Sequence, residues 1–186
     1  MGSQLNHRAD LFLDPDEDPR AGGPQSSDER AILVTYLRRH RQTLELKCQG
    51  LGPEELARRS VEPSTMSLLG LVRHMAEVER SWFRRIVSGQ PDVPRLFQSP
   101  EDPDGDFDGA RADPEVVSGA WEAWRSEVAF AERVVAEADD LGAVCELPGE
   151  GSLSLREVLV HMIEEYARHN GHADLLRERI DGRVGV

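Results

Sequence analysis

Four long stretches of this 186-residue chain carry apolar residues at helical spacing, three or four positions apart. They cover residues 28–50, 67–89, 114–140 and 154–179, and segments rich in Gly, Pro and Asp separate them. The alternation of apolar and polar residues that indicates strands is nearly absent. Four helices of this length in one small domain predict an all-α fold, most simply a helix bundle.

Local signals mark where these helices begin and end. Ser27 or Asp28 suits the cap of the first helix, Ser67 opens the second, and Pro114 fits the first turn of the third. Gly50 follows the first helix and suits its end. The first helix is expected to bury an apolar face made of Ile32, Leu33, Tyr36, Leu37, Leu44 and Cys48.

Segments outside the helices set the expected domain limits. Residues 1–27 contain DPDEDP and GGPQSS, and this acidic, Pro- and Gly-rich composition predicts a flexible arm. The bundle domain is therefore expected over residues 28–183. Residues 90–114 are rich in Pro and Asp and predict a long acidic loop between the second and third helices. Residues 141–152 are expected to form a connector that pairs briefly as strand.

Composition limits the classes of partner. Charged residues make up 31% of the chain, the formal net charge is −13, and no basic stripe is visible. Nucleic acid and membrane surfaces are therefore not expected as partners. No apolar run approaches the roughly 20 residues of a membrane span, and no signal-peptide pattern is present, so we expect a cytoplasmic location. Cys48 and Cys145 lie far apart without a CxxC pair and are expected to be buried spectators.

The last helix gathers His and Glu on one face. Within HMIEEYARHNGHADLLRE, residues 161–178, helical geometry places His161, Glu165, His169 and His172 in a band of about 80°. Apolar residues that belong in a core share this face. Burial of an ionised carboxylate is costly unless the group is paired or binds a metal. The pattern therefore indicates either hydrogen-bonded polar pairs or part of a metal site.

His74, within GLVRHMAEVE, is the candidate third ligand from a facing helix. Imidazole and carboxylate at positions i and i+4 of one helix can bind a divalent cation together with a ligand from a neighbouring helix. Such a set leaves coordination positions for water or substrate. Spacing alone does not decide between this metal site and a set of ordinary polar contacts.

A likeness to a known family rests on four stretches: DERAILVTYLRRHRQTLELKCQGL, EPSTMSLLGLVRHMAEVERSWFRRIVSG, PDGDFDGA and LREVLVHMIEEYARHNGHADLLRERIDG. Together they resemble the DinB superfamily, most closely its mini-circle protein branch, over about residues 28–183. The resemblance implies an up-down-down-up four-helix bundle with a metal between its helices. The superfamily's usual ligands are a His in the second helix and an HxxxH pair in the last. His74 matches the first of these positions and His169 the last.

One position departs from the family pattern. Glu165 stands where the middle histidine is usual. The set His74, Glu165 and His169 instead resembles that of mycothiol-dependent maleylpyruvate isomerase, a zinc enzyme of the superfamily. The resemblance thus implies a divalent metal at these three residues, with Zn²⁺ foremost, while Ni²⁺, Mn²⁺ and Fe²⁺ also accept such ligands.

Each residue around His74, Glu165 and His169 has one or more candidate roles. His172 is a candidate fourth ligand, general base, hydrogen-bond partner of a ligand or helix contact. His161 is expected to be a hydrogen-bond partner, with a ligand role as the alternative. Glu164 is expected to be solvated or paired with Arg168. Gly171 is expected to allow close approach of another helix.

Two further features, an Asp-rich stretch and the three tryptophans, are interpreted as structural in preference to functional. Residues 102–109, DPDGDFDG, superficially match a calcium loop but lack the bidentate Glu at the required offset, so they are interpreted as an acidic loop. Trp82, Trp121 and Trp124 are expected in the core, and the alternative is that one of them walls a pocket.

The resemblance implies thiol chemistry. Characterised enzymes of the superfamily mostly use low-molecular-weight thiols such as mycothiol or bacillithiol, and an open zinc site can lower the pKa of a thiol. The leading expectation is a metal-dependent S-transferase or isomerase of detoxification or secondary metabolism. Its partners would be a small-molecule thiol and an electrophile near the loop 90–114. Arg73 and Arg168 are candidate contacts for the thiol headgroup.

Two alternative functions belong to other classes of protein. The chain could be a metal-dependent hydrolase with His172 as the general base, because a bound hydroxide needs a base beside an open coordination position. It could also be a non-catalytic metal- or ligand-binding stress protein. Bundles of this kind commonly pair through helix faces, so a homodimer is a further expectation, although no exposed apolar stripe marks its interface.

Overall fold

The structure is a computed structural model that describes residues 12–13, 16, 18–21, 28–147, 149 and 151–185. Its elements are α1 (Glu29–Cys48), α2 (Pro53–Leu56), α3 (Leu68–Glu79), the π-helix η1 (Arg80–Val87), α4 (Gly105–Asp108), α5 (Pro114–Glu137), β1 (Val144–Leu147), β2 (Gly151–Ser154) and α6 (Leu155–Asp181). None of the helices in these ranges combines the length and the apolar character that crossing a membrane requires.

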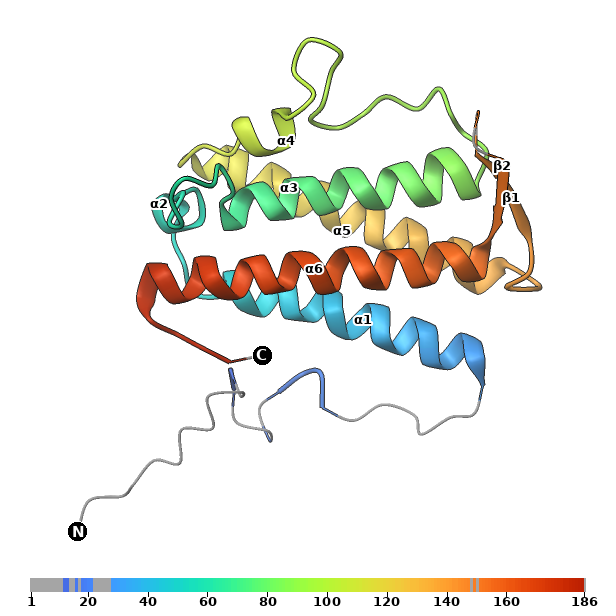
Figure 1. Cartoon of the computed structure of the whole chain (residues 1–186), viewed down its shortest axis with the longest axis horizontal. Helices are drawn as coiled ribbons and strands as arrows, with labels where there is room; N and C mark the ends of the chain where they lie inside the picture. Colours follow the sequence, from blue (N-terminus) through green and yellow to red (C-terminus); the bar gives the residue numbers. More distant parts are fainter. Residues whose placement is uncertain are drawn as a thin grey trace.

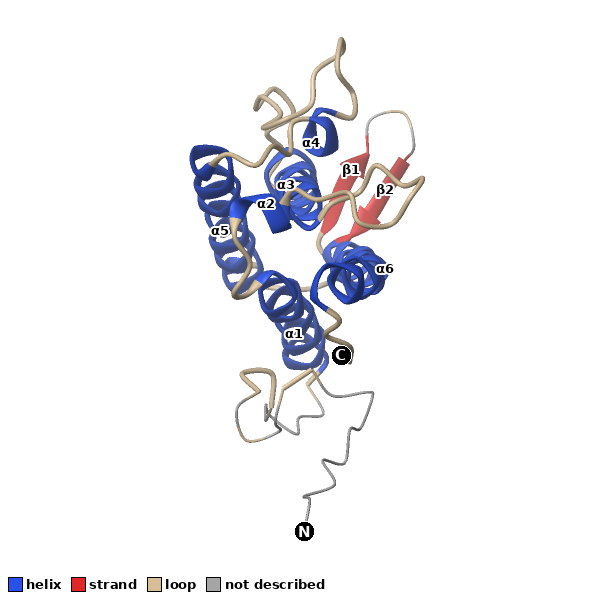
Figure 2. Ribbon diagram, turned by 90° about the vertical axis from the view of Figure 1, so that its left-hand side faces the viewer, coloured by secondary structure: helices blue, strands red, loops and turns tan. Residues whose placement is uncertain are grey.

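Four long helices, α1, α3 with η1, α5 and α6, lie side by side (Figure 1). In that view α1 and α6 run from right to left, whereas α3 and α5 run in the opposite direction. Seen end-on, α5 packs beside α3 and α6 beside α1, and α3 also contacts α6 (Figure 2). The all-α prediction is confirmed. The sheet that accompanies the helices is a two-stranded hairpin, β1 antiparallel to β2, in the predicted connector.

The long helices begin where the sequence predicts. The Asp28 side chain caps α1, and the Ser67 side chain caps α3 by accepting a backbone N–H of the first turn. Pro114 is the first residue of α5. Ser154 and Glu157 form a reciprocal capping box at the start of α6. These caps satisfy backbone donors that would otherwise have no partner, so the boundaries follow from local chemistry.

The predicted buried face of α1 is wrong in part. Leu37 and Leu44 are buried, but Ile32 is 40% exposed and Tyr36 is 52% exposed. The packed face of α1 instead includes Arg41. A prediction from apolar residues misplaces this face because an ion pair lets a cation occupy the interior.

The second long helix changes its hydrogen-bond pattern halfway. From Arg80 to Val87 it is a π-helix, in which bonds span five residues, as in the bond from Ser88 N to Phe83 O at 3.0 Å. No residue in the predicted helix 67–89 signals this change. The π-helical turns carry Trp82 and the fully buried Phe83.

The structure describes the predicted loop 90–114 in full and the predicted arm 1–27 only in part. The loop 90–114 contains one short helix, α4, which packs against α3. The predicted flexible arm over 1–27 falls mostly outside the described residues. Of those described, Phe12 is buried, and the Nζ of Lys47 lies 4.2 Å from the centre of its ring.

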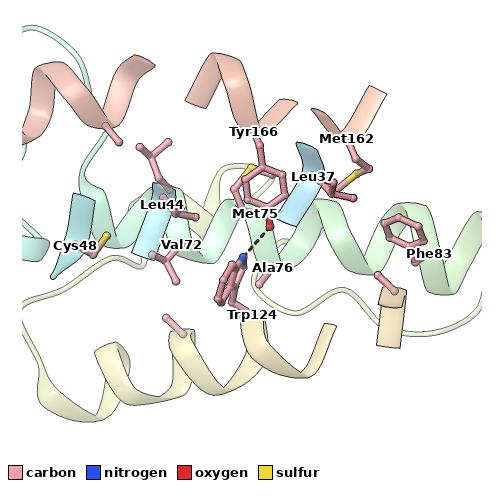
Figure 3. Close-up of a cluster of buried hydrophobic side chains, with 14 of the residues drawn as sticks. Leu37, Leu44, Cys48, Val72, Met75, Ala76, Phe83, Trp124, Met162 and Tyr166 are labelled. Atoms are coloured by element: carbon pink, nitrogen blue, oxygen red, sulfur yellow. Dashed lines mark hydrogen bonds between the residues drawn. The ribbon is translucent and has the colours of Figure 1, made fainter. Parts of the chain in front are cut away.

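One chain of hydrogen bonds joins all four long helices in the core. Arg41 of α1 donates two bonds of 2.8 Å to the carboxylate of Glu79 in α3. Tyr166 of α6 donates to the same carboxylate at 2.8 Å. Trp124 of α5 donates to the Tyr166 hydroxyl, also at 2.8 Å (Figure 3). All four side chains are buried, so each must have its partners in place for the charges to be tolerated.

Replacement of Glu79 by Ala is expected to destabilise the fold strongly. Arg41 would keep its buried charge but lose its buried partner and retain only the exposed Glu132 at 3.8 Å, and breaking a buried pair typically costs about 3–5 kcal/mol. Urea unfolding followed by circular dichroism measures the loss. The control is Glu29→Ala, which removes an exposed ion pair with Arg156 and should leave the unfolding free energy nearly unchanged. Equal effects of the two substitutions would contradict this account.

Cys48 and Cys145 are free thiols and both are buried, as predicted. Burial raises the pKa of the Cys48 thiol from 9.0 to about 12 and raises the pKa of the Cys145 thiol. Because the thiolate is the reactive form, Cys48 in the folded protein is a poor nucleophile.

Alkylation of Cys48 by iodoacetamide at pH 8 should therefore be much slower in the folded protein than in urea, as followed by mass spectrometry. The unfolded thiol loses its proton near its ordinary pKa of 9.0, whereas the folded thiol keeps it up to about 12. The contribution of Cys48 to stability should thus fall as pH rises through that window. Similar alkylation rates in both states would show that Cys48 is accessible and its pKa is not raised.

Candidate metal centre

His74 of α3 and the pair Glu165 and His169 of α6 meet between these two helices. One donor atom from each residue lies within 4.8 Å of the other two. Glu165 Oε2 is 3.5 Å from His169 Nε2, and the rings of His74 and His169 are 4.7 Å apart between centroids. Two imidazoles and one carboxylate at this separation fit the donor set of a divalent cation. The structure thus brings together the three residues that the sequence predicts as ligands.

The helices place these side chains at the rim of the core. His74 precedes Met75, which is fully buried, and Glu165 precedes Tyr166, which is also fully buried. Adjacent positions on a helix differ by about 100°, so each polar side chain emerges at the edge of the α3–α6 contact. The spacing of four residues between Glu165 and His169 puts both on one face of α6.

The electrostatics of the cluster favour uncharged imidazole at His169. Burial lowers the pKa of His169 to about 4, and the proximity of His74, His172 and Arg168 acts in the same direction. At neutral pH the ring therefore has a free lone pair, which is the protonation state that a metal requires.

The Nδ1 atom of His74 has a hydrogen-bond partner that the sequence does not predict. His74 Nδ1 lies 2.8 Å from Asp106 Oδ2, and Asp106 is only 1% exposed. The ring of Phe107 stacks on His74 at 5.0 Å between centroids. Six aspartates lie in the segment 90–114, and three of them, Asp104, Asp106 and Asp108, share the family-like stretch PDGDFDGA, so the sequence does not single out Asp106. The fold selects it, because α4 packs against α3.

The two remaining histidines of α6 contact ligand candidates from outside the cluster. His172 Nδ1 lies 3.3 Å from His169 Nδ1, the nitrogen that does not face Glu165. His161 Nε2 lies 3.7 Å from Glu165 Oε1, and its ring is 4.5 Å from that of Trp82. Half-buried Trp82 therefore lines this side of the cluster.

The two arginines considered for the thiol headgroup lie in different surroundings. Arg73 Nε donates to the backbone oxygen of Asp106 at 2.7 Å, and its Nη2 donates to that of Gly105 at 2.8 Å. Its guanidinium also lies 4.0 Å from the centre of the Phe97 ring. Arg73 thus holds the α4 segment. Arg168 is exposed on α6 beside His169.

The predicted role of Gly171 is wrong. This residue is exposed, and a Cβ built at its position would meet no atom within 4 Å. No neighbouring helix approaches it in the described part of the chain, since position 171 faces solvent. Glu164 is exposed, as expected.

Comparison with known proteins gives an independent result. The profile of the mycothiol-S-transferase family matches residues 32–182, a range that contains His74, Glu165 and His169. No curated protein matches the chain. The family match extends over most of the sequence and agrees with the likeness carried by the two His-bearing motifs. The chain therefore belongs to the mycothiol-S-transferase family, within the DinB superfamily.

Proposed function

We propose that this protein is a metal-dependent S-transferase or isomerase that uses a low-molecular-weight thiol of the mycothiol type. The observation that carries the proposal is the convergence of His74, Glu165 and His169, within a chain of the mycothiol-S-transferase family. This donor set suits Zn²⁺ and leaves a coordination position for an exogenous ligand. A bound divalent cation supplies the positive charge that lowers the pKa of a thiol.

The protein's own side chains would shield and balance this centre. Phe107 covers one side of His74, and Trp82 packs on His161. The Phe107 ring limits the access of water to one side of His74, which strengthens electrostatic interactions there. Glu165 contributes the negative charge that partly offsets a divalent cation.

A thiol that binds as thiolate must lose its proton to a base. His161 and His172 are the two further imidazoles beside the cluster. His172 is turned towards His169 at 3.3 Å, whereas the His161 side chain is 36% exposed and reaches solvent. His161 is therefore the better placed of the two to take up a proton and release it to water.

The electrophile is proposed to bind beside the acidic loop. A cavity of about 680 Å³ lies between η1, the start of that loop and β1. Ile86, Val87 and Val144 give it an apolar lining, and Arg85, Arg95 and Glu146 add charges of both signs. Such a lining suits a small, partly apolar molecule that also carries polar groups.

The finer features of the family fold belong to the same proposal. The directions of α1, α3, α5 and α6 in Figure 1 support the up-down-down-up four-helix bundle of the DinB superfamily. A cytoplasmic location and a homodimer remain proposals that the sequence motivates.

Metal content is the first test. The purified protein should hold about one transition-metal ion per chain by elemental mass spectrometry, and His169→Ala and Glu165→Ala should lose it. His40→Ala is the matched control, because His40 is a half-buried imidazole of α1 outside the cluster. A wild-type protein that stays metal-free after incubation with Zn²⁺ would contradict the proposal.

Thiol binding is the second test. Addition of mycothiol to the Co²⁺-substituted protein should produce a sulfur-to-cobalt charge-transfer band, and S-methylated mycothiol should not. The physical reason is that only a free thiol can supply a thiolate ligand to the metal. Loaded protein that shows no such band, yet hydrolyses model esters, would favour the hydrolase alternative instead.

A further inference from the structure

We propose that Asp106 is the positioning residue that makes His74 able to bind a metal, by holding the imidazole proton on Nδ1. This inference rests on the proposed metal centre. Asp106 lies outside the two His-bearing motifs, in the short helix α4.

The hydrogen bond decides the tautomer. An ionised carboxylate can only accept, so the contact of 2.8 Å between Asp106 Oδ2 and His74 Nδ1 requires the proton to be on Nδ1. In a neutral ring the lone pair is then on Nε2, which is the remaining nitrogen available to a metal. Carboxylates that orient ligand histidines in this way also raise their basicity.

The surroundings of Asp106 require a carboxylate rather than an amide. Besides His74, Gln98 Nε2 donates to Oδ2 at 3.0 Å and the backbone N–H of Phe107 donates to Oδ1 at 3.0 Å. Both carboxylate oxygens are therefore acceptors. Asparagine has a single acceptor oxygen, so its NH₂ group would replace one of the two acceptors. That NH₂ would either face one of these donors or donate to His74 Nδ1, and in the second case the ring proton would move to Nε2.

The segment that carries Asp106 is fixed to α3 on either side of His74. Arg73 binds the backbone oxygens of Gly105 and Asp106. Glu77 Oε2 accepts the backbone N–H groups of Leu96 at 2.8 Å and Phe97 at 2.9 Å. A Cβ at position 105 would overlap the Phe97 carbonyl oxygen, so the close contact between the backbones of residues 97 and 105 requires glycine.

The charge of Asp106 points to a cation beyond the imidazole. Its carboxylate is buried and forms no direct ion pair with a lysine or arginine within the described residues, while the Arg73 guanidinium, which binds the backbone, acts on its charge at longer range. A buried anion is costly without a compensating charge. A divalent cation on the Nε2 side of His74 would provide that charge through the ring.

The test compares Zn²⁺ affinity, measured by competition with a chelator, among Asp106→Ala, Asp106→Asn and a control. Loss of a carboxylate behind a metal-binding histidine typically weakens metal binding about 10–100-fold. We expect both Asp106 variants to fall in that range. Asp108→Asn is the control, because Asp108 lies in the same short helix but is exposed and pairs with Arg59 at 2.9 Å. It should bind Zn²⁺ as wild type does.

A second readout needs no metal. Nitrogen-15 NMR of the metal-free wild type should show the His74 proton on Nδ1, and Asp106→Asn should shift it towards Nε2. Zn²⁺ affinity of Asp106→Asn equal to that of wild type, or a neutral His74 ring with its proton on Nε2 in wild type, would overturn the inference. Wild type that binds no metal would instead overturn the proposed function, and the tautomer would still decide the role of Asp106. If the variants do not fold, the wild-type tautomer remains decisive.

Discussion

The buried ion pair between Arg41 and Glu79 is the contact on which the arrangement of the helices depends. Tyr166 and Trp124 extend it, so that one residue from each long helix contributes to a single hydrogen-bonded chain. Such a chain closes only when every helix has the correct rotation and height. Tyr166 directly follows Glu165, so the contact that fixes the rotation of α6 in the core also fixes the direction of a metal-ligand candidate at its rim. Stability and site geometry therefore share one cause.

The sequence predicts the features that local chemistry determines. The starts of the long helices follow from capping residues such as Asp28 and Ser154, whose side chains satisfy backbone donors close by in sequence. The pairing of Glu165 with His169 follows from the helical repeat. The position of His74 at the edge of an apolar stripe makes it the candidate third ligand, but spacing alone does not decide between a metal site and ordinary polar contacts. The family resemblance favours the metal site, and the structure brings the three residues together.

What the sequence does not predict depends on contacts between distant segments. Tyr36 is apolar enough for a core but is exposed, because the buried stripe of α1 runs through Leu37, Arg41 and Leu44 and leaves Tyr36 at its side. Asp106 lies in a run of similar acidic residues and gains its role only when α4 packs against α3. Gly171 fits a helix contact by size alone, and among the described residues no helix lies close enough to make it. Each of these is a property of the assembled fold.

The π-helical turns of η1 have a consequence for how the chain tolerates changes in length. A π-helix accommodates more residues per turn than an α-helix does, so η1 holds a surplus that regular winding would not. Deletion of one residue near the end of η1 would let the segment rewind as α-helix, and loss of the surplus residue would leave the residues beyond it on nearly the same face. Trp82 and Phe83, near the start of η1, would keep their contacts with His161 and with the core. In this helix, the winding absorbs a change of one residue in length and does not pass it on to the rest of the chain.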